Sequence, residues 1–96
     1  READAVVENF RPGVMERLGV GWPQLSQVNP RLIYCGVSGF GATGPDSRMP
    51  AFDGKIQAMS GLMSRTGEPE QGPMRAGFAA ADVATGMMTG FALATA

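Results

Sequence analysis

Histidine is absent from this chain of 96 residues, and its absence narrows the chemistry that the chain can perform. Without an imidazole, the chain cannot supply a Ser-His-Asp or Cys-His nucleophile, a histidine general base or a histidine-containing zinc site. Any catalytic group must therefore be a carboxylate, a hydroxyl, a thiol, a phenol or an amine. We expect no metal site.

Cysteine, long apolar runs and an excess of one charge are also missing. Cys35 is the only cysteine, so an internal disulfide is excluded and a reducing, cytoplasmic setting is expected. No run approaches the roughly 20 apolar residues of a membrane span, and no basic-then-apolar signal segment opens the chain. The chain has eight Lys and Arg residues and nine Asp and Glu residues, so it has no excess of positive charge that would attract nucleic acid or an anionic membrane. The expected partner is a small molecule or another protein.

The two ends of the sequence lack the usual signals of a complete domain. The chain begins at Arg1 without an initiator methionine, and it stops at Ala96 within an apolar helical pattern that has no C-cap. We therefore expect an internal piece of a longer protein. Such a piece should expose apolar surface or associate, because part of its core lies elsewhere.

The first third of the sequence predicts a strand, a helical crossover and a second strand. Apolar residues at 5–7 indicate a short strand, and short helices are expected at 14–18 and 22–28. The near-continuous apolar run at 32–37 is typical of a strand that is covered on both faces in a parallel sheet. Residues 4–37 are therefore predicted to form a βαβ-like unit of an α/β fold.

The remainder is predicted to be a loop followed by helices. Residues 38–52 are rich in Gly, Pro, Ser and Asp and predict a long loop. Within the helical region 53–96, Asp53 is expected to cap a helix that ends near Thr66. A short extended segment at 74–78 and a last helix that opens at Asp82 complete the prediction.

One phosphate-binding motif occurs in the loop. Residues 39–44 read Gly-Phe-Gly-Ala-Thr-Gly and fit the dinucleotide pattern GxGxxG. That pattern needs a helix to begin within the motif, whereas Pro45 and Pro50 follow here in an irregular stretch. We interpret this segment as a mobile Gly-rich loop.

Three side chains remain as candidates for chemistry. Asp82 lies among small apolar residues, where its carboxylate can cap the helix by accepting N–H groups of Ala84 or Thr85, or can act as a nucleophile. Asp53 has the same two possible roles, and a role as a helix cap or a loop-stabilising residue is favoured over one as a nucleophile. Cys35 is interpreted as a structural residue, because it lies in the apolar strand without a histidine to activate it.

Several strings together resemble the family III CoA-transferases of CaiB/BaiF type, in order and over nearly the whole chain. The strings that carry the resemblance lie at 8–19, 29–34, 38–45, 51–53, 57–61 and 66–69. The resemblance implies an interior part of a much longer enzyme, built on a Rossmann-like α/β domain and working as an interlocked homodimer. It also implies an acyl-CoA and a carboxylic acid acceptor as substrates, with no tightly bound cofactor. The isolated segment is expected to be inactive, because the family's N-terminal CoA-binding segment and glycine-rich loop are missing.

The resemblance also implies roles for individual residues. By likeness to formyl-CoA transferases, Asp82 aligns with the nucleophilic aspartate, which forms a mixed anhydride and then an aspartyl-CoA thioester. The residues that look like CoA contacts are Asn9, Phe10, Arg17, Leu18 and Phe52. Arg17 would suit a phosphate, because a guanidinium makes paired charge-assisted bonds. Asp53 stands where the relatives have a glutamate, and is a possible auxiliary residue.

Two alternatives to a transferase stay open. The α-methylacyl-CoA racemases share the fold and the aspartate, but they look like His-Asp at the positions of Phe52 and Asp53. Because Phe52 cannot serve as a proton-transfer group, the racemase is disfavoured. The other alternative is a non-catalytic segment that serves only association.

Overall fold

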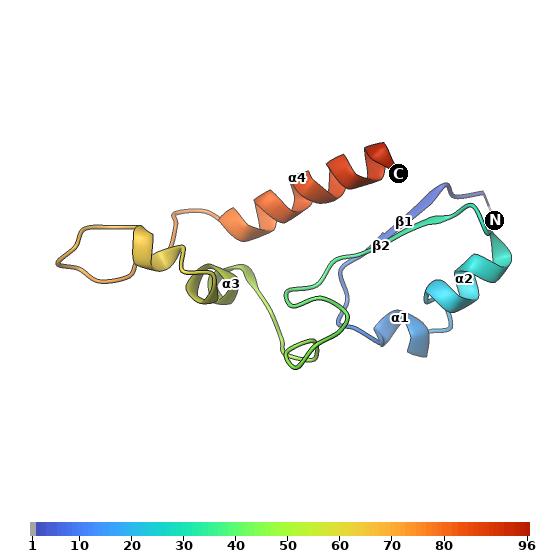
Figure 1. Cartoon of the computed structure of the whole chain (residues 1–96), viewed down its shortest axis with the longest axis horizontal. Coiled ribbons are helices and arrows are strands. Elements are labelled where there is room, and N and C mark those ends of the chain that lie inside the picture. The colour runs from blue at the N-terminus through green and yellow to red at the C-terminus, as the bar shows by residue number, and fades with distance from the viewer. Residues whose placement is uncertain (1) are drawn as a thin grey trace. The chain divides into compact units, whose positions relative to one another are not determined.

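The computed structural model describes residues 2–96 and shows a mixture of strands and helices (Figure 1). In chain order the described elements are β1 (Ala5–Glu8), α1 (Val14–Arg17), α2 (Trp22–Val28), β2 (Ile33–Gly36), α3 (Asp53–Met59), the 3-10 helix η1 (Met63–Arg65) and α4 (Ala80–Thr95). The predicted α/β class is confirmed. Two compact units are present, one formed by residues 2–50 with Thr89–Ala96 and the other by Ala51–Met88.

The first unit contains a two-stranded parallel sheet. Ala5 of β1 pairs with Ile33 of β2, and Glu8 pairs with Gly36. The Val37 N–H also donates to the Glu8 carbonyl at 2.9 Å, so the two strands end together at one edge. Parallel strands require a crossover connection, which α1 and α2 supply, as the sequence predicts.

Glycine and proline fix the ends of the crossover helices. Gly13 precedes α1 with φ +84°, and Gly19 follows it with φ +74°, a backbone region that favours glycine. In α2, Pro23 stands in the first turn, where its missing N–H removes no helical hydrogen bond. After α2, the Asn29 side chain donates to the Ala3 carbonyl at 3.1 Å and so ties the crossover to the chain before β1.

Coverage of the sheet is only partial, which corrects the expectation of a strand buried on both faces. Leu32, just before β2, is buried, but Ile33–Cys35 are half-buried and Val7 is 52% exposed. The reason is physical, because two strands and two short helices supply too little surface to cover both faces. Large apolar side chains are exposed along the chain, among them Leu18, Phe52, Met87, Met88 and Phe91. This exposure agrees with the expectation for a piece of a larger core.

The second unit contains α3, η1 and the first half of α4. The helix predicted to run from Asp53 to near Thr66 is shorter than expected. It ends at Met59, and the chain turns at Gly61, whose φ is +81°. No strand forms at residues 74–78, where the Met74 N–H donates instead to the Met63 carbonyl at 3.1 Å. The last helix begins at Ala80, two residues earlier than predicted.

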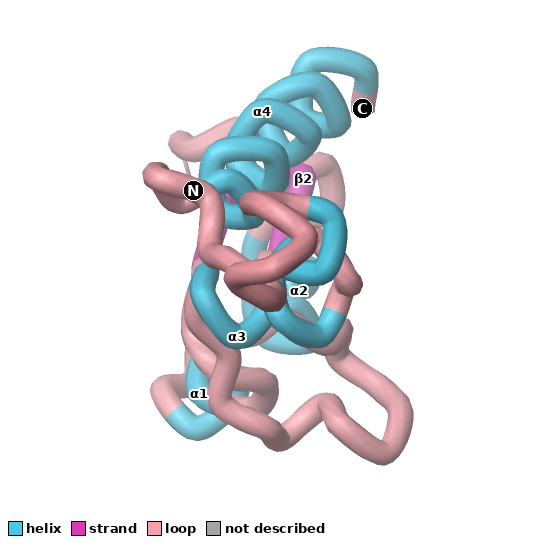
Figure 2. The backbone as a smooth tube through the Cα atoms, turned by 90° about the vertical axis from the view of Figure 1, so that its left-hand side faces the viewer, coloured by secondary structure: helices cyan, strands magenta, loops and turns pink. Residues whose placement is uncertain are grey.

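Loops make up much of the remaining backbone, as the pink tube in Figure 2 shows. No helix or strand lies between β2 and α3, so the GxGxxG segment is a loop, as interpreted from the sequence. Among residues 2–96, no helix combines the length and the apolar character that crossing a membrane would require.

Candidate functional site

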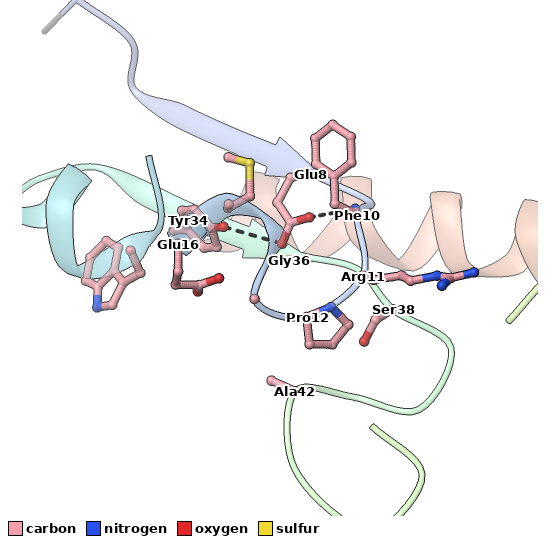
Figure 3. A pocket seen from close by; sticks show the side chains of 12 residues that line it. Glu8, Phe10, Arg11, Pro12, Glu16, Tyr34, Gly36, Ser38 and Ala42 are labelled. Carbon is pink, nitrogen blue, oxygen red and sulfur yellow. Dashed lines mark hydrogen bonds between the residues drawn. The ribbon is translucent and has the colours of Figure 1, made fainter. Parts of the chain in front are cut away.

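A pocket of about 530 Å³ lies at the edge of the sheet where β1 and β2 end, and we call it the strand-end pocket (Figure 3). In an open α/β sheet, the carboxyl ends of the strands are where ligands bind. The pocket is lined by Glu8, Phe10, Arg11, Pro12, Gly13, Met15, Glu16, Trp22, Tyr34, Gly36, Ser38 and Ala42.

The Glu8 carboxylate organises this edge. Its Oε2 accepts the backbone N–H of Phe10 at 2.7 Å, and its Oε1 accepts the Tyr34 hydroxyl at 3.3 Å. Figure 3 shows the carboxylate between these two donors. A Cβ added at Gly36 would lie 2.7 Å from Glu8 Oε1, so the absence of a side chain there leaves room for the carboxylate. Glu8 thus links the two strands and fixes the backbone that follows β1.

The phenol of Tyr34 is held in its neutral form. Burial raises its pKa above the ordinary value of 10.0, and the negative charge of Glu8, the hydrogen bond to Glu8 and the charge of Glu16 raise it further. The Tyr34 ring lies beside Trp22, with ring centroids 6.1 Å apart and planes inclined by 56°. The pocket therefore combines two carboxylates and the Arg11 side chain with aromatic surface.

Four of the predicted CoA contacts belong to the same unit as this edge but differ in their relation to the pocket. Asn9 donates from Nδ2 to the Val37 carbonyl at 2.9 Å, and so joins the ends of the two strands. Phe10 lines the pocket and is 54% exposed. Arg17, the last residue of α1, and Leu18, its C-cap, are exposed and are not among the lining residues.

A second cluster lies in the other unit, around the carboxylate of Asp53. Asp53 Oδ1 accepts the backbone N–H groups of Ala81 at 2.9 Å and Asp82 at 3.3 Å. Asp53 Oδ2 accepts Gln57 Nε2 at 2.6 Å and Arg75 Nη2 at 3.2 Å. The first turn of a helix leaves N–H groups without helical partners, and Asp53 satisfies two of them on α4.

Asp53 therefore does not cap its own helix as predicted. It is the first residue of α3, whose N-cap position is held by Phe52 without a side-chain hydrogen bond. Its carboxylate is directed to α4, which begins 27 positions later in the sequence. Asp53 is therefore a capping residue, as the sequence favours, but the helix that it caps is α4 and not α3.

Opposing influences act on the Asp53 carboxyl. The side chain is buried, and burial raises its pKa. Hydrogen bonds from the Asp82 and Ala81 N–H groups, from Gln57 and from Arg75 outweigh burial and hold the pKa below its ordinary value of 3.8. The group is thus a buried, ionised carboxylate whose charge is compensated by donors.

Gln57 completes the cluster and has no solvent exposure. Besides its bond to Asp53, its Nε2 donates to the Phe78 carbonyl at 3.1 Å, and its Oε1 accepts the Ala76 N–H at 2.9 Å. The side-chain amide therefore uses both of its hydrogens and its oxygen. It connects α3 to the segment that leads into α4.

The cap prediction for Asp82 is wrong. Because α4 begins at Ala80, Asp82 lies inside the first turn, where its own N–H is the capped group. Its side chain is exposed. The structure thus gives Asp82 a backbone held by Asp53 and an accessible carboxylate.

The remaining predicted positions have simpler surroundings. Phe52 is 67% exposed, and Cys35 is a free, half-buried cysteine in β2. Within the described residues, no group of three His, Cys, Asp or Glu side chains could hold a metal ion. The strand-end residues lie in one unit, and Phe52, Asp53 and Asp82 lie in the other.

The sequence interpretation missed Glu8, Tyr34, Gln57 and Arg75. A carboxylate directly after the strand predicted at residues 5–7 is a usable signal for Glu8. Asp53 and Gln57 stand four positions apart, a spacing at which helical side chains meet. No comparable signal in the sequence pointed to Arg75, 22 positions after its partner.

The chain is similar to known proteins over its whole length. The model of CoA-transferase family III matches residues 1–96. The acetyl-CoA:oxalate CoA-transferase of Acetobacter aceti is 56% identical over 77 residues, which are 80% of this chain and 20% of that protein. The succinate–glutarate CoA-transferase of Agrobacterium fabrum is 47% identical over 87 residues, which are 91% of this chain and 22% of that protein.

A solved structure gives the same result at the level of the fold. The crystal structure of a CaiB/BaiF family protein from Brucella suis superposes with a TM-score of 0.85 at 40% identity, over 98% of this chain and 26% of that one. The chain thus spans about a fifth of the length of these two curated relatives. A match of the family model to all 96 residues, with relatives that are CoA-transferases by name, shows that this chain belongs to CoA-transferase family III.

Proposed function

We propose that this segment carries the nucleophile and part of the CoA-binding surface of an acyl-CoA:carboxylate CoA-transferase. Because the segment spans about a fifth of its relatives, the activity belongs to a protein of about the relatives' length, hereafter the complete protein. In this proposal the segment is an interior part of one large domain, and the complete protein is a cytoplasmic homodimer. Relatives at 47–56% identity that are named as CoA-transferases support the reaction class.

The observation that carries the proposal is the state of Asp82. Its backbone N–H is held by Asp53, while its side chain is exposed and open to a substrate. A carboxylate can serve as a nucleophile in covalent catalysis, which divides one difficult transfer into easier steps. This chemistry needs no imidazole, in keeping with the absence of histidine.

The proposed steps conserve atoms and charge. The Asp82 carboxylate attacks the thioester carbon of the donor acyl-CoA, and the C–S bond breaks to release CoA thiolate and leave a mixed anhydride. The thiolate attacks the aspartyl carbonyl, which gives an aspartyl-CoA thioester and frees the donor acid with one oxygen from Asp82. The acceptor carboxylate then displaces CoA to form a second anhydride, and thiolate attack on the acceptor carbonyl releases the new acyl-CoA. Asp82 is regenerated with one oxygen from the acceptor.

We also propose that Asn9, Phe10, Arg17, Leu18 and Phe52 contact CoA. The supporting observations are the position of Asn9 and Phe10 at the strand-end edge and the exposure of all five side chains. Arg17 and Leu18 follow the lining residue Glu16 directly in the chain. Arg17 offers a cationic fork for a phosphate.

The racemase alternative requires a second acid–base group that the segment does not offer at Phe52. A hydrocarbon ring cannot exchange a proton, whatever its position. The two activities also give different products. A racemase exchanges the α-hydrogen of the acyl group with solvent deuterium without moving CoA, whereas the proposed transferase moves CoA to a second acid.

Covalent trapping tests the proposal. The complete protein is incubated with an acyl-CoA donor, quenched with hydroxylamine and analysed by peptide mass spectrometry. We expect a hydroxamate at Asp82 in the wild-type protein and none in Asp82→Asn, with Asp46→Asn, a change in an exposed loop, as the control. CoA exchange that persists in Asp82→Asn would exclude Asp82 as the nucleophile.

A further inference from the structure

Gln57 is the one large side chain in the described residues that is fully buried, and it is polar. A buried amide is costly unless its hydrogen bonds are made. All of its hydrogen-bonding capacity is directed at groups that lead to the start of α4, namely Asp53, Ala76 and Phe78. Packing alone does not explain a glutamine at this position, because an apolar side chain of similar size would fill the same volume.

The bonds of Gln57 form a continuous path to Asp82. Gln57 Nε2 holds Asp53 Oδ2 at 2.6 Å, and the other oxygen of the same carboxylate holds the N–H of Asp82 at 3.3 Å. Gln57 also holds the Ala76 N–H and the Phe78 carbonyl, which precede α4. The orientation of Asp53 and the entry of the chain into α4 are thus set by one side chain.

We infer that Gln57 is a positioning residue for the reaction at Asp82. It acts by orienting the Asp53 carboxylate on the first turn of α4, so that the Asp82 backbone is held in one place during attack on the thioester. This inference rests on the proposed function, because it takes Asp82 to be the nucleophile. Arg75 assists by donating to the same oxygen, Asp53 Oδ2, as an exposed cation on a buried carboxylate.

The expected effect of disturbing this path falls on a rate rather than on binding. A reacting group displaced by about 1 Å loses roughly 100-fold in rate. The side-chain hydrogen bonds of Gln57 go to Asp53, Phe78 and Ala76, and none of these residues is a predicted CoA contact or the proposed nucleophile. Its loss should therefore lower kcat and the rate of Asp82 acylation and leave the KM for the acyl-CoA unchanged.

The most informative substitution is Gln57→Glu, which keeps the size of the side chain. At neutral pH it places a second carboxyl against Asp53 Oδ2, where two ionised carboxylates repel. The charged groups of this cluster are Asp53 on α3 and Arg75 on the segment before α4, and α4 contributes the backbone N–H groups of Ala81 and Asp82, which donate to Asp53. When protonated, the introduced carboxyl can again donate to Asp53.

The test is a single-turnover acylation of the complete protein at several pH values. The rate is measured from the amount of hydroxamate that forms at Asp82. For Gln57→Glu we expect full final labelling, a rate constant lower by about 10- to 100-fold at pH 8, and recovery as the pH falls. Arg75→Leu, at an exposed side chain, should show the same full labelling with a smaller loss of rate. Gln71→Glu, in the exposed turn of the same unit, is the control and should match the wild type.

Three outcomes would overturn the inference, and they can be told apart. Rates equal to the wild type at every pH would exclude positioning by Gln57 and leave the proposed function standing. Reduced final labelling at an unchanged rate would show that Gln57 only maintains the fold. Absence of labelling at Asp82 in the wild-type protein would overturn the proposed function and this inference together.

Discussion

Replacing Gln57 with leucine tests the buried cluster through stability rather than catalysis. Gln57→Leu keeps a side chain of similar size and removes three hydrogen bonds, to Asp53, Phe78 and Ala76. Two of the three groups keep another partner, because Asp53 Oδ2 retains Arg75 and the Phe78 carbonyl retains the Ala80 N–H. The Ala76 N–H is left without its partner.

The cost follows from this count. The Ala76 N–H is only partly buried, so leaving it unpaired costs about 1 kcal/mol, the low end of the range for a buried donor. A hydrogen bond to a charged group contributes about 1.5–3 kcal/mol. The two contributions set a local loss of at least about 2 kcal/mol, and the lost Phe78 bond adds to it. Since about 1.4 kcal/mol corresponds to a factor of ten, the local opening equilibrium should rise by roughly 30-fold or more.

Hydrogen–deuterium exchange of the complete protein, read by mass spectrometry on peptides that cover residues 76–82, measures this opening. We expect exchange there to accelerate by roughly 30-fold in Gln57→Leu, while peptides that cover β1 and β2 keep their wild-type rates. Gln71→Leu, at an exposed position without a described side-chain hydrogen bond, is the matched control. Unchanged exchange over residues 76–82 would refute the assignment of the cluster as the device that holds the start of α4.

Two further predictions concern the carboxylates of the two clusters. Because the folded-state pKa of Asp53 is lowered below 3.8, its stabilising contribution is present above that pH and is lost as the pH falls through the lowered value. The difference in unfolding free energy between the wild type and Asp53→Asn, measured by urea titration, should therefore shrink on acidification, and a pH-independent difference would contradict this. Gly36→Ala should lower the thermal midpoint, because its Cβ would lie 2.7 Å from Glu8 Oε1 and displace the carboxylate from Tyr34 and Phe10. In a protein that already carries Glu8→Ala, Gly36→Ala should lower the thermal midpoint by less. Equal losses of thermal midpoint with and without Glu8→Ala would exclude the clash with the Glu8 carboxylate as the cause.

Local patterns in the sequence were sufficient to predict the first unit. The apolar runs at 5–7 and 32–37, separated by two short helices with glycine and proline at their ends, predicted the parallel pair β1 and β2. Turn signals also identified the loop that precedes α3. These features depend on neighbours in the chain, so composition and spacing suffice.

The second unit was predicted less well because its interactions are remote in sequence. Asp53 has the sequence signature of a cap for α3, yet it caps α4, 28 and 29 positions away at Ala81 and Asp82. The start of α4 was therefore misplaced by two residues, and Asp82 was given the cap role. Residue identity alone does not show which helix a carboxylate will reach.

The candidate site shows the same division. The positions of Asn9 and Phe10 at the end of a strand were predictable from the pattern, whereas the bonds of Glu8 to Tyr34 and Phe10 depend on the pairing register of the strands. Family resemblance predicts Asp82 as the nucleophile, and the structure adds what surrounds its backbone. Its backbone is held by Asp53 and, through Asp53, by Gln57 and Arg75.

The central claim is that the Asp82 carboxylate exchanges an oxygen with the acids it transfers between. The most direct measurement is to let the complete protein turn over an acyl-CoA with an acceptor acid labelled with oxygen-18 in its carboxylate, and then to analyse the peptide that contains Asp82 by mass spectrometry. The proposed mechanism predicts that Asp82 acquires the heavy oxygen, because the second anhydride leaves one acceptor oxygen on the aspartate. Turnover of the labelled acceptor with no heavy oxygen at Asp82 would contradict the account.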